Sequence, residues 1–268
     1  MDVVNTRWRF FRYASPAAFY PLAGRLVPWF AAVAAVLALA GLYLGMLRAP
    51  TDATQGDAYR IIFIHVPAAW MSMVLYVVMA FWAAIGWAFN ARLASVVARA
   101  IAPTGAMFTF LALWTGALWG KPTWGTWWVW DARLTSELIL LFLYGGYLAL
   151  VSAIDDVRRA DRAGALLAIV GSVNVPIIYF SVIWWNTLHQ GASVSVAAAP
   201  KMAAIMLQSM LLMTLSFWAY AFAVVFVRAR AIALERDNRS AWAAEAVGRA
   251  RTRTQTQTQA RTQTGAGT

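Results

Sequence analysis

Apolar residues form six long runs along the chain, and the segments between the runs carry most of the charged residues. The runs cover residues 28–47, 62–89, 101–118, 134–154, 163–186 and 202–227. Each run is near or above the roughly 20 residues that cross a bilayer as an α-helix. The pattern therefore predicts an all-α integral membrane protein with six transmembrane helices. The first run is longer than the apolar stretch of a typical signal peptide, so we expect it to be retained.

Composition and charge placement support this interpretation. Hydrophobic residues make up 62% of the 268 residues and charged residues only 12%, about half the charged share of a typical soluble domain. The net charge of +11 would suit nucleic acid, but 17 of the 22 Lys and Arg residues lie on one side of the predicted topology. The positive-inside rule then predicts that both termini are cytoplasmic. The expected partner of this charge is anionic membrane lipid, and no nucleic acid partner is expected.

The predicted domains are a six-helix membrane domain over residues 1–230 and a cytoplasmic tail over residues 231–268. The tail ends in RTRTQTQTQARTQTGAGT, a low-complexity polar stretch that cannot bury a core, so we expect disorder there. The stretch SAWAAEAVGRAR before it is compatible with a short helix. The chain contains no cysteine, which excludes disulfides, thiolate chemistry and cysteine-ligated metal sites.

The unusual residues meet on the outer side of the predicted topology. The stretch WGKPTWGTWWVWDARLTS, residues 119–136, is predicted to be an amphipathic loop between the third and fourth helices. Both histidines of the chain, His65 and His189, lie at the outer ends of the second and fifth helices. The loop contributes five tryptophans followed by an acidic and a basic residue, namely Trp119, Trp124, Trp127, Trp128, Trp130, Asp131 and Arg133.

Each of these features also has an ordinary structural explanation. Tryptophans at a bilayer boundary form aromatic belts, and a single histidine there is usually a hydrogen-bonded structural residue. Asp131 is a good N-cap for the fourth helix. Glu137 is explained by a pair with Arg133 one helical turn away, or by extension of its side chain to the interface. In an extended chain, Trp128 and Trp130 would lie on one face and Trp127 on the other.

Haem fits the combination of two imidazoles and a tryptophan platform better than a bare metal ion does. Zinc and copper usually require three or four protein ligands, whereas the haem macrocycle supplies four nitrogens and needs only one or two axial ligands. His65 and His189 are the candidate metal ligands, and the tryptophan rings would cover the flat face of a non-covalent haem b. Arg60, Lys121 and Arg133 are candidate partners for its propionates.

Three stretches resemble the CcmC family of haem-handling proteins in cytochrome c maturation. WGTWWVWDARLTSELILLFLYGGYLAL resembles the family's WWD signature, while HVPAAWMS and WWNTLHQGAS resemble its two histidine segments. The resemblance covers about residues 15–225. It implies a protein of the bacterial inner membrane that holds haem at the periplasmic face between His65 and His189.

The resemblance also implies partners. The WWD segment would support the haem and its encounter with the periplasmic haem chaperone CcmE, which then holds haem covalently. An ATP-binding cassette pair, CcmA and CcmB, and a small single-helix subunit, CcmD, would accompany this step. The chain has no Walker A sequence, so we expect no ATPase activity of its own.

The sequence therefore favours a haem-binding and haem-transfer protein over an enzyme with its own acid and base residues. The larger haem lyases carry more helices and additional histidines, so they fit poorly. Two alternatives of other classes remain: a membrane b-type cytochrome, and a small-solute permease with Asn174 as its main polar group near the bilayer midplane.

Overall fold

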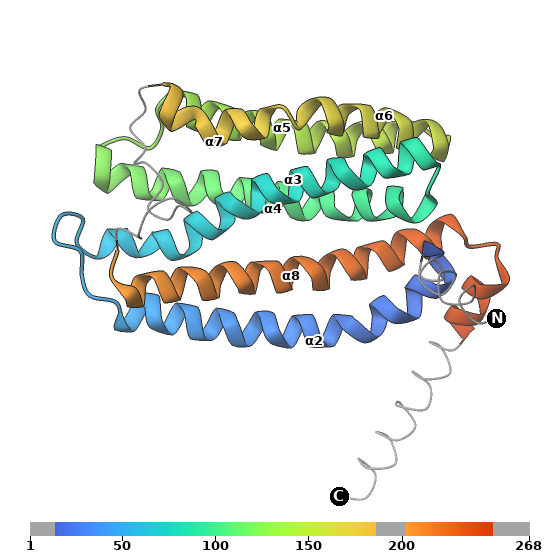
Figure 1. The fold of residues 1–268 in the computed structure, drawn as a ribbon, viewed down its shortest axis with the longest axis horizontal. Helices are drawn as coiled ribbons and strands as arrows, with labels where there is room; N and C mark the ends of the chain where they lie inside the picture. Colours follow the sequence, from blue (N-terminus) through green and yellow to red (C-terminus); the bar gives the residue numbers. More distant parts are fainter. Residues whose placement is uncertain (1–13, 186–201, 249–268) are drawn as a thin grey trace, which may run out of the picture.

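The computed structural model describes residues 14–185 and 202–248, and these form a bundle of long helices (Figure 1). Six spans are long and apolar enough to cross a membrane, which confirms the predicted all-α fold. The elements in chain order are α2 (Pro16–Leu42) with a π-helical turn η2 (Tyr43–Arg48), a 3-10 turn η3 (Asp57–Ile61) with α3 (Ile62–Phe89), α4 (Arg92–Trp124), α5 (Ala132–Ala153), α6 (Val157–Gly171) with α7 (Asn174–Trp184), and α8 (Ala204–Arg236).

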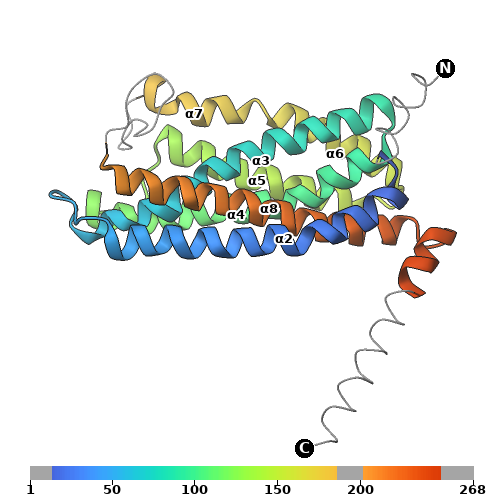
Figure 2. The ribbon, with the colours of Figure 1, turned by 60° about the horizontal axis from the view of Figure 1, so that its bottom comes forward.

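The helices form three layers, which Figures 1 and 2 show from two directions. α2 and α8 pack along each other in one outer layer, and α3 and α4 form the middle layer. α5, α6 and α7 make up the other outer layer. α3 also contacts both α6 and α8, so it lies at the centre of the bundle.

The connections place one set of helix ends together. The segment between η2 and α3, the end of α4, the start of α5, the end of α7 and the start of α8 all lie at the left of Figure 1. His65 lies near this end of α3, so we call it the His65 end. The start of α2 and the end of α8 lie at the opposite end.

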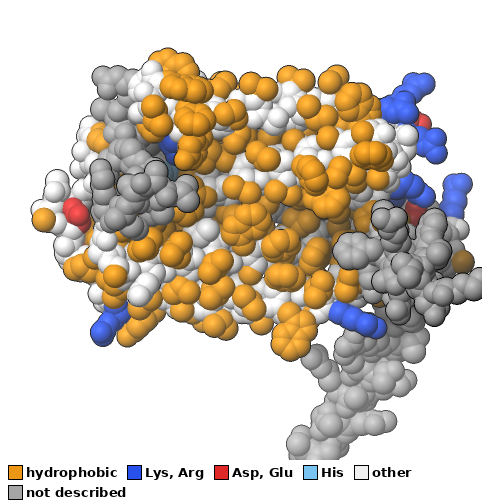
Figure 3. All heavy atoms as spheres, viewed as in Figure 1, with side chains coloured by type: hydrophobic (Ala, Val, Ile, Leu, Met, Phe, Trp, Pro, Cys, Tyr) orange, Lys and Arg blue, Asp and Glu red, His pale blue; other side chains and the backbone are white. Residues whose placement is uncertain are grey.

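The surface of the bundle suits a lipid environment. Hydrophobic side chains cover the middle of the face drawn in Figure 3, and charged side chains lie toward its two ends. Leu39, Phe142 and Ile183 expose 70%, 67% and 71% of their surface. Exposed apolar side chains of this size would be unfavourable in water but contact acyl chains in a bilayer.

The core depends on two buried tyrosines and on glycines that make room for them. The rings of Tyr76 and Tyr144 meet edge to face with centroids 4.8 Å apart, and both residues are fully buried. Tyr144 donates a 2.9 Å hydrogen bond to Ser72 O on α3. A Cβ at Gly105 would lie 2.1 Å from Tyr144 Cζ, so α4 can approach α5 here only through a glycine.

The helix boundaries differ from the hydrophobic runs at several places. α2 starts at Pro16, twelve residues before the predicted run, because Ser15 caps it by accepting from Ala18 N and proline suits the first turn. α4 continues to Trp124. The fifth run is broken into α6 and α7 around residues 172–173, just before Pro176, where proline cannot donate to the preceding turn.

The chain continues as structured helix beyond the predicted membrane domain. α8 runs to Arg236, and residues 241–248 form a further short helix, in the stretch for which a helix was expected. Trp242 packs against Tyr20 with ring centroids 5.7 Å apart and donates to Asp237 Oδ2 at 3.3 Å. These contacts tie the short helix to α2. Residues 249–268, where disorder was expected, lie outside the described residues.

Candidate functional site

A cavity at the His65 end is enclosed by three helices and the segment that joins α4 to α5. It measures ≈ 40 Å³, room for a few water molecules. Its walls combine an imidazole, three indoles, two carboxyl groups and a guanidinium. The side chains that carry this chemistry are His65, Trp124, Trp127, Trp128, Asp131, Arg133 and Glu137.

The imidazole of His65 is held by residues of α4. His65 Nδ1 lies 3.0 Å from Thr115 Oγ1, and Thr115 is buried. The ring also meets Trp119 edge to face with centroids 5.7 Å apart. Gly116 lies against the ring, since a Cβ there would be 3.1 Å from His65 Cε1.

The tryptophan segment is shorter than the predicted loop. Trp119, Lys121 and Trp124 lie in the last turns of α4, and α5 already begins at Ala132. α4 ends because Gly125 adopts a left-handed conformation with φ 78°, and its N–H bonds to Lys121 O. The non-helical part of the predicted loop is therefore only residues 125–131.

Two indoles of this segment pair as predicted, but Trp127, which was predicted on the opposite face, lines the same cavity as Trp128. Trp128 and Trp130 meet edge to face with centroids 5.4 Å apart. Trp128 lines the cavity, whereas Trp130 lies at its outside and exposes 75% of its surface. Trp127 lines the cavity as well and exposes 54%. The segment thus forms both a wall and an exposed aromatic rim.

The start of α5 fixes two polar residues of the cavity. Asp131 Oδ1 accepts from Leu134 N at 2.8 Å, which confirms the predicted N-cap. Arg133 Nη1 donates to Ile178 O on α7 at 3.2 Å. Asn174 Nδ2 donates to Ser136 O at 2.9 Å, so this buried amide joins α7 to α5.

Glu137 does not have the environment that its sequence context suggested. It is buried rather than extended to the interface, and no ion pair joins it to Arg133 among the described residues. Its Oε1 instead lies 2.6 Å from Ser72 Oγ on α3. The helical spacing of four is compatible with a pair, but the carboxyl group turns inward to a hydroxyl that is distant in sequence.

Among the described residues, one buried donor of the cavity has no hydrogen-bond acceptor. Trp128 Nε1 is shielded from solvent and finds no partner within the described part of the chain. A buried indole N–H without an acceptor costs free energy. Together with the guanidinium of Arg133 in the same wall, it would suit a ligand that brings an anionic oxygen into the cavity.

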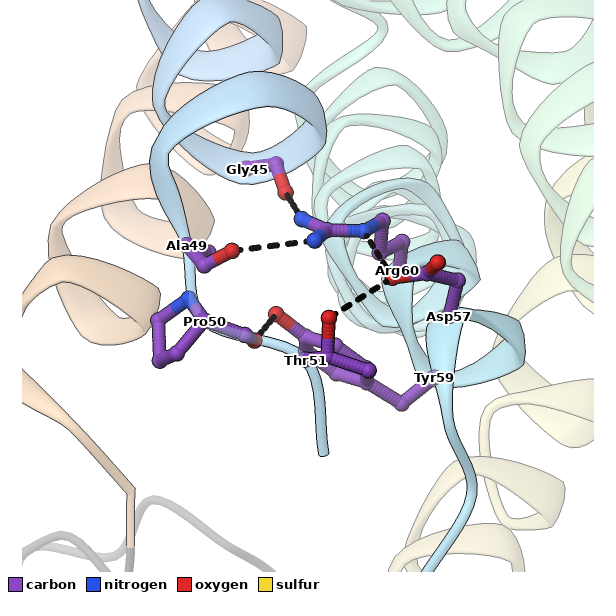
Figure 4. Close-up of polar contacts among 7 residues, drawn as sticks. All are labelled: Gly45, Ala49, Pro50, Thr51, Asp57, Tyr59 and Arg60. Atoms are coloured by element: carbon purple, nitrogen blue, oxygen red, sulfur yellow. Dashed lines mark hydrogen bonds and ion pairs between the residues drawn. The ribbon is translucent and has the colours of Figure 1, made fainter. Parts of the chain in front are cut away.

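Four predicted site residues do not line the cavity. Arg60 is engaged by the end of the first span and by Asp57 (Figure 4): its guanidinium donates to Gly45 O in η2 at 2.7 Å, to Ala49 O at 3.0 Å and to Asp57 at 2.9 Å. Lys121 Nζ donates to Gly125 O at 3.0 Å. Trp119 contacts His65 and Trp130 contacts Trp128, but neither tryptophan lines the cavity itself.

Trp119 also joins the site to the loop that follows α2. Its Nε1 donates to Gln55 Oε1 at 2.8 Å. Asp52 shapes that loop by accepting from the backbone N–H groups of Gln55 and Thr54, and these bonds hold the pKa of Asp52 below its usual range. A second cavity of ≈ 270 Å³ lies on this side of Trp119, with Phe63 and methionines of α8 among its lining.

The structure adds site residues that the sequence did not single out and leaves one prediction open. His189 lies in residues 186–201, outside the described residues. Thr115, Gly116 and Ser72 were not predicted, because a hydroxyl or a glycine in an apolar helix carries no pattern that distinguishes a functional position from a packing position.

Comparison with known proteins gives a consistent result. A family profile described as Heme exporter protein C matches residues 9–244. Heme exporter protein C of Escherichia coli K12 is 53% identical over 180 residues, 67% of this chain and 74% of that protein. Its counterpart in Bradyrhizobium diazoefficiens is 50% identical over 204 residues, 76% of this chain and 77% of that protein. A mitochondrial protein of Marchantia polymorpha named for ccmC-like cytochrome c biosynthesis is 47% identical over 154 residues, 58% of this chain and 65% of that protein.

Proposed function

We propose that this chain, which belongs to the Heme exporter protein C family, binds haem at the His65 end and presents it for transfer in c-type cytochrome biogenesis. The chain is a multi-pass protein of the inner membrane. The names of its relatives refer to haem export and to cytochrome c biosynthesis, which supports haem as the cargo.

The observation that carries the proposal is the cavity that contains His65. A neutral imidazole is a common axial ligand of haem iron. The same cavity offers the guanidinium of Arg133 and the indole N–H of Trp128, which has no acceptor in the described part of the chain. Both groups can donate to a propionate carboxylate. Exposed indoles of Trp127 and Trp130 lie nearby for the flat face of the macrocycle.

The cavity could accept one polar group of haem but is too small for the whole molecule. A volume of ≈ 40 Å³ cannot enclose a macrocycle, so the ring would lie along the exposed rim formed by Trp127 and Trp130. A cargo held at a rim remains accessible to a second protein. Such a site suits transfer more than permanent retention of a cofactor.

The charge distribution supports a periplasmic location for this site. In the topology that the basic residues favour, the His65 end faces the periplasm. We propose His189 as the second axial ligand, the periplasmic haem chaperone CcmE as the recipient, and CcmA, CcmB and CcmD as the accompanying subunits. These assignments rest on the positions of the two histidines and on membership of the family.

The proposal is tested by loading of the recipient in intact membranes. Cells that express this chain with CcmA, CcmB, CcmD and CcmE should accumulate haem-bearing CcmE, which haem staining detects after denaturing electrophoresis. His65→Ala should abolish the signal, whereas Thr109→Val, a buried position elsewhere on α4, should retain it. Equal loading with His65→Ala at equal membrane abundance would refute the proposed role of this site.

A further inference from the structure

The hydroxyl of Thr115 fixes where the proton of the His65 ring lies. Thr115 Oγ1 is 2.6 Å from Leu111 O and 3.3 Å from Ala112 O. Both carbonyls only accept hydrogen bonds, so the single hydroxyl proton is directed to them. The oxygen can then only accept from His65 Nδ1, 3.0 Å away. A neutral His65 therefore carries its proton on Nδ1 and its lone pair on Nε2.

The residue next to Thr115 fixes where the ring itself lies. A Cβ at Gly116 would lie 3.1 Å from His65 Cε1, tighter than an ordinary carbon–carbon contact. A side chain at residue 116 would require the ring to move by a few tenths of an ångström, so a glycine there favours the observed position of the ring against α4. Trp119, about one helical turn further along, contacts the ring edge to face.

We propose that Thr115 and Gly116 are positioning residues that hold His65 as the Nδ1–H tautomer, with Nε2 as the nitrogen that binds metal. The identity of that metal as haem iron rests on the proposed function, but the tautomer does not. A metal-binding imidazole usually donates its other N–H to a fixed acceptor, which orients the ring and raises its basicity. Thr115 supplies that acceptor here before any ligand arrives.

The tautomer can be measured without haem because the chain has only two histidines. His189→Gln leaves one imidazole, whose nitrogen chemical shifts in ¹⁵N-histidine-labelled, haem-free protein distinguish a protonated from an unprotonated nitrogen. At pH 8 we expect a protonated Nδ1 and an unprotonated Nε2. Thr115→Val should shift the population toward Nε2–H, and Thr115→Ser should restore the original pattern. An unprotonated Nδ1 in the parent, or identical shifts with valine, would overturn the proposal.

The effect of Thr115→Val on haem binding needs a control for the intrahelical hydrogen bond that this substitution also removes. Thr109 makes the same kind of intrahelical bond, from Oγ1 to Gly105 O at 2.8 Å, so Thr109→Val reports the cost of losing that bond alone. Loss of an outer partner typically weakens metal binding about 10- to 100-fold, and we expect a loss in this range for Thr115→Val in haem titrations. Thr115→Ser and Thr109→Val should remain within about threefold of the parent.

The outcomes separate the two proposals. A parent that shows the Nδ1–H tautomer but binds no haem would refute the proposed function and leave the positioning role intact. A parent that binds haem, with equal losses in Thr115→Val and Thr109→Val, would refute the positioning role alone. Gly116→Ala provides a second test: it should displace the His65 ring and change the Soret maximum of bound haem, and an unchanged spectrum would count against the role of Gly116.

Discussion

The buried indole N–H of Trp128 gives the sharpest quantitative prediction. Trp128→Phe keeps a smaller aromatic ring in the cavity wall and removes the buried donor, which has no acceptor among the described residues. If this donor binds a propionate, the variant loses one hydrogen bond to a charged group, about 1.5–3 kcal/mol. Each 1.4 kcal/mol is tenfold in affinity, so haem binding should weaken by about 10- to 150-fold.

The assay is a titration of haem-depleted protein with haem, followed by the Soret absorbance, and it has two matched controls. Trp130→Phe removes the same N–H from an indole that packs on Trp128 but exposes 75% of its surface and does not line the cavity. Its affinity should stay within about threefold of the parent. The dimethyl ester of haem replaces both carboxylates by neutral esters, and the effect of Trp128→Phe should shrink with this ligand.

Two results would refute the reasoning. Equal losses for Trp128→Phe with haem and with the dimethyl ester would show that the indole acts through packing and not through its donor. Equal losses for Trp128→Phe and Trp130→Phe would show that both rings serve as a general aromatic surface, as the aromatic-belt explanation of this segment requires.

Three further predictions concern the framework of the site. Gly105→Ala should lower the free energy of unfolding in detergent by about 1–3 kcal/mol, because its Cβ would collide with buried Tyr144. Gly145→Ala has open space around it and should not lower this free energy. Equal effects of the two substitutions would contradict the packing account. Arg60→Ala should increase proteolysis of the loop after η2, because the guanidinium binds Gly45 O and Ala49 O at the start of that connection. Haem affinity should stay unchanged. A large loss of affinity would instead support a contact of Arg60 with a propionate. The pKa of Asp52 lies below its usual range because two backbone N–H groups of its loop donate to it. The hydrogen-exchange protection of those two amides, corrected for intrinsic rates, should therefore persist as the pH falls from neutral. It should be lost only when the pH falls through the lowered pKa of Asp52. Loss of protection well above the ordinary pKa of an aspartate would contradict this assignment.

The features that could be predicted from the sequence were the membrane spans, which long apolar runs define, and contacts between residues that are close in the sequence. Six apolar runs are sufficient to define six spans, because a bilayer requires a fixed length of helix with satisfied backbone groups. The N-cap role of Asp131 follows from one residue and its position before a helix. The alternation of an extended chain predicts the contact of Trp128 with Trp130 but not the position of Trp127, which lines the same cavity as Trp128.

The features that could not be predicted depend on contacts between distant segments. A pair of Arg133 with Glu137 is reasonable on an isolated helix, but Ser72 on α3 provides the actual partner of Glu137. Arg60 was a candidate partner for a haem propionate because it is a cation on the predicted outer side. The carbonyls of Gly45 and Ala49 accept hydrogen bonds from its guanidinium instead. No periodicity or composition indicates that Thr115 meets His65, which is 50 residues away.

The most direct test of the central claim is an absorption spectrum of the purified protein, before and after reduction, compared with His65→Ala and His189→Ala. The account predicts a Soret band in the parent that is lost or displaced in both variants, with Thr109→Val unchanged. A band that is identical in His65→Ala, or no band in the parent even after haem is added, would contradict a haem site at this end of the bundle.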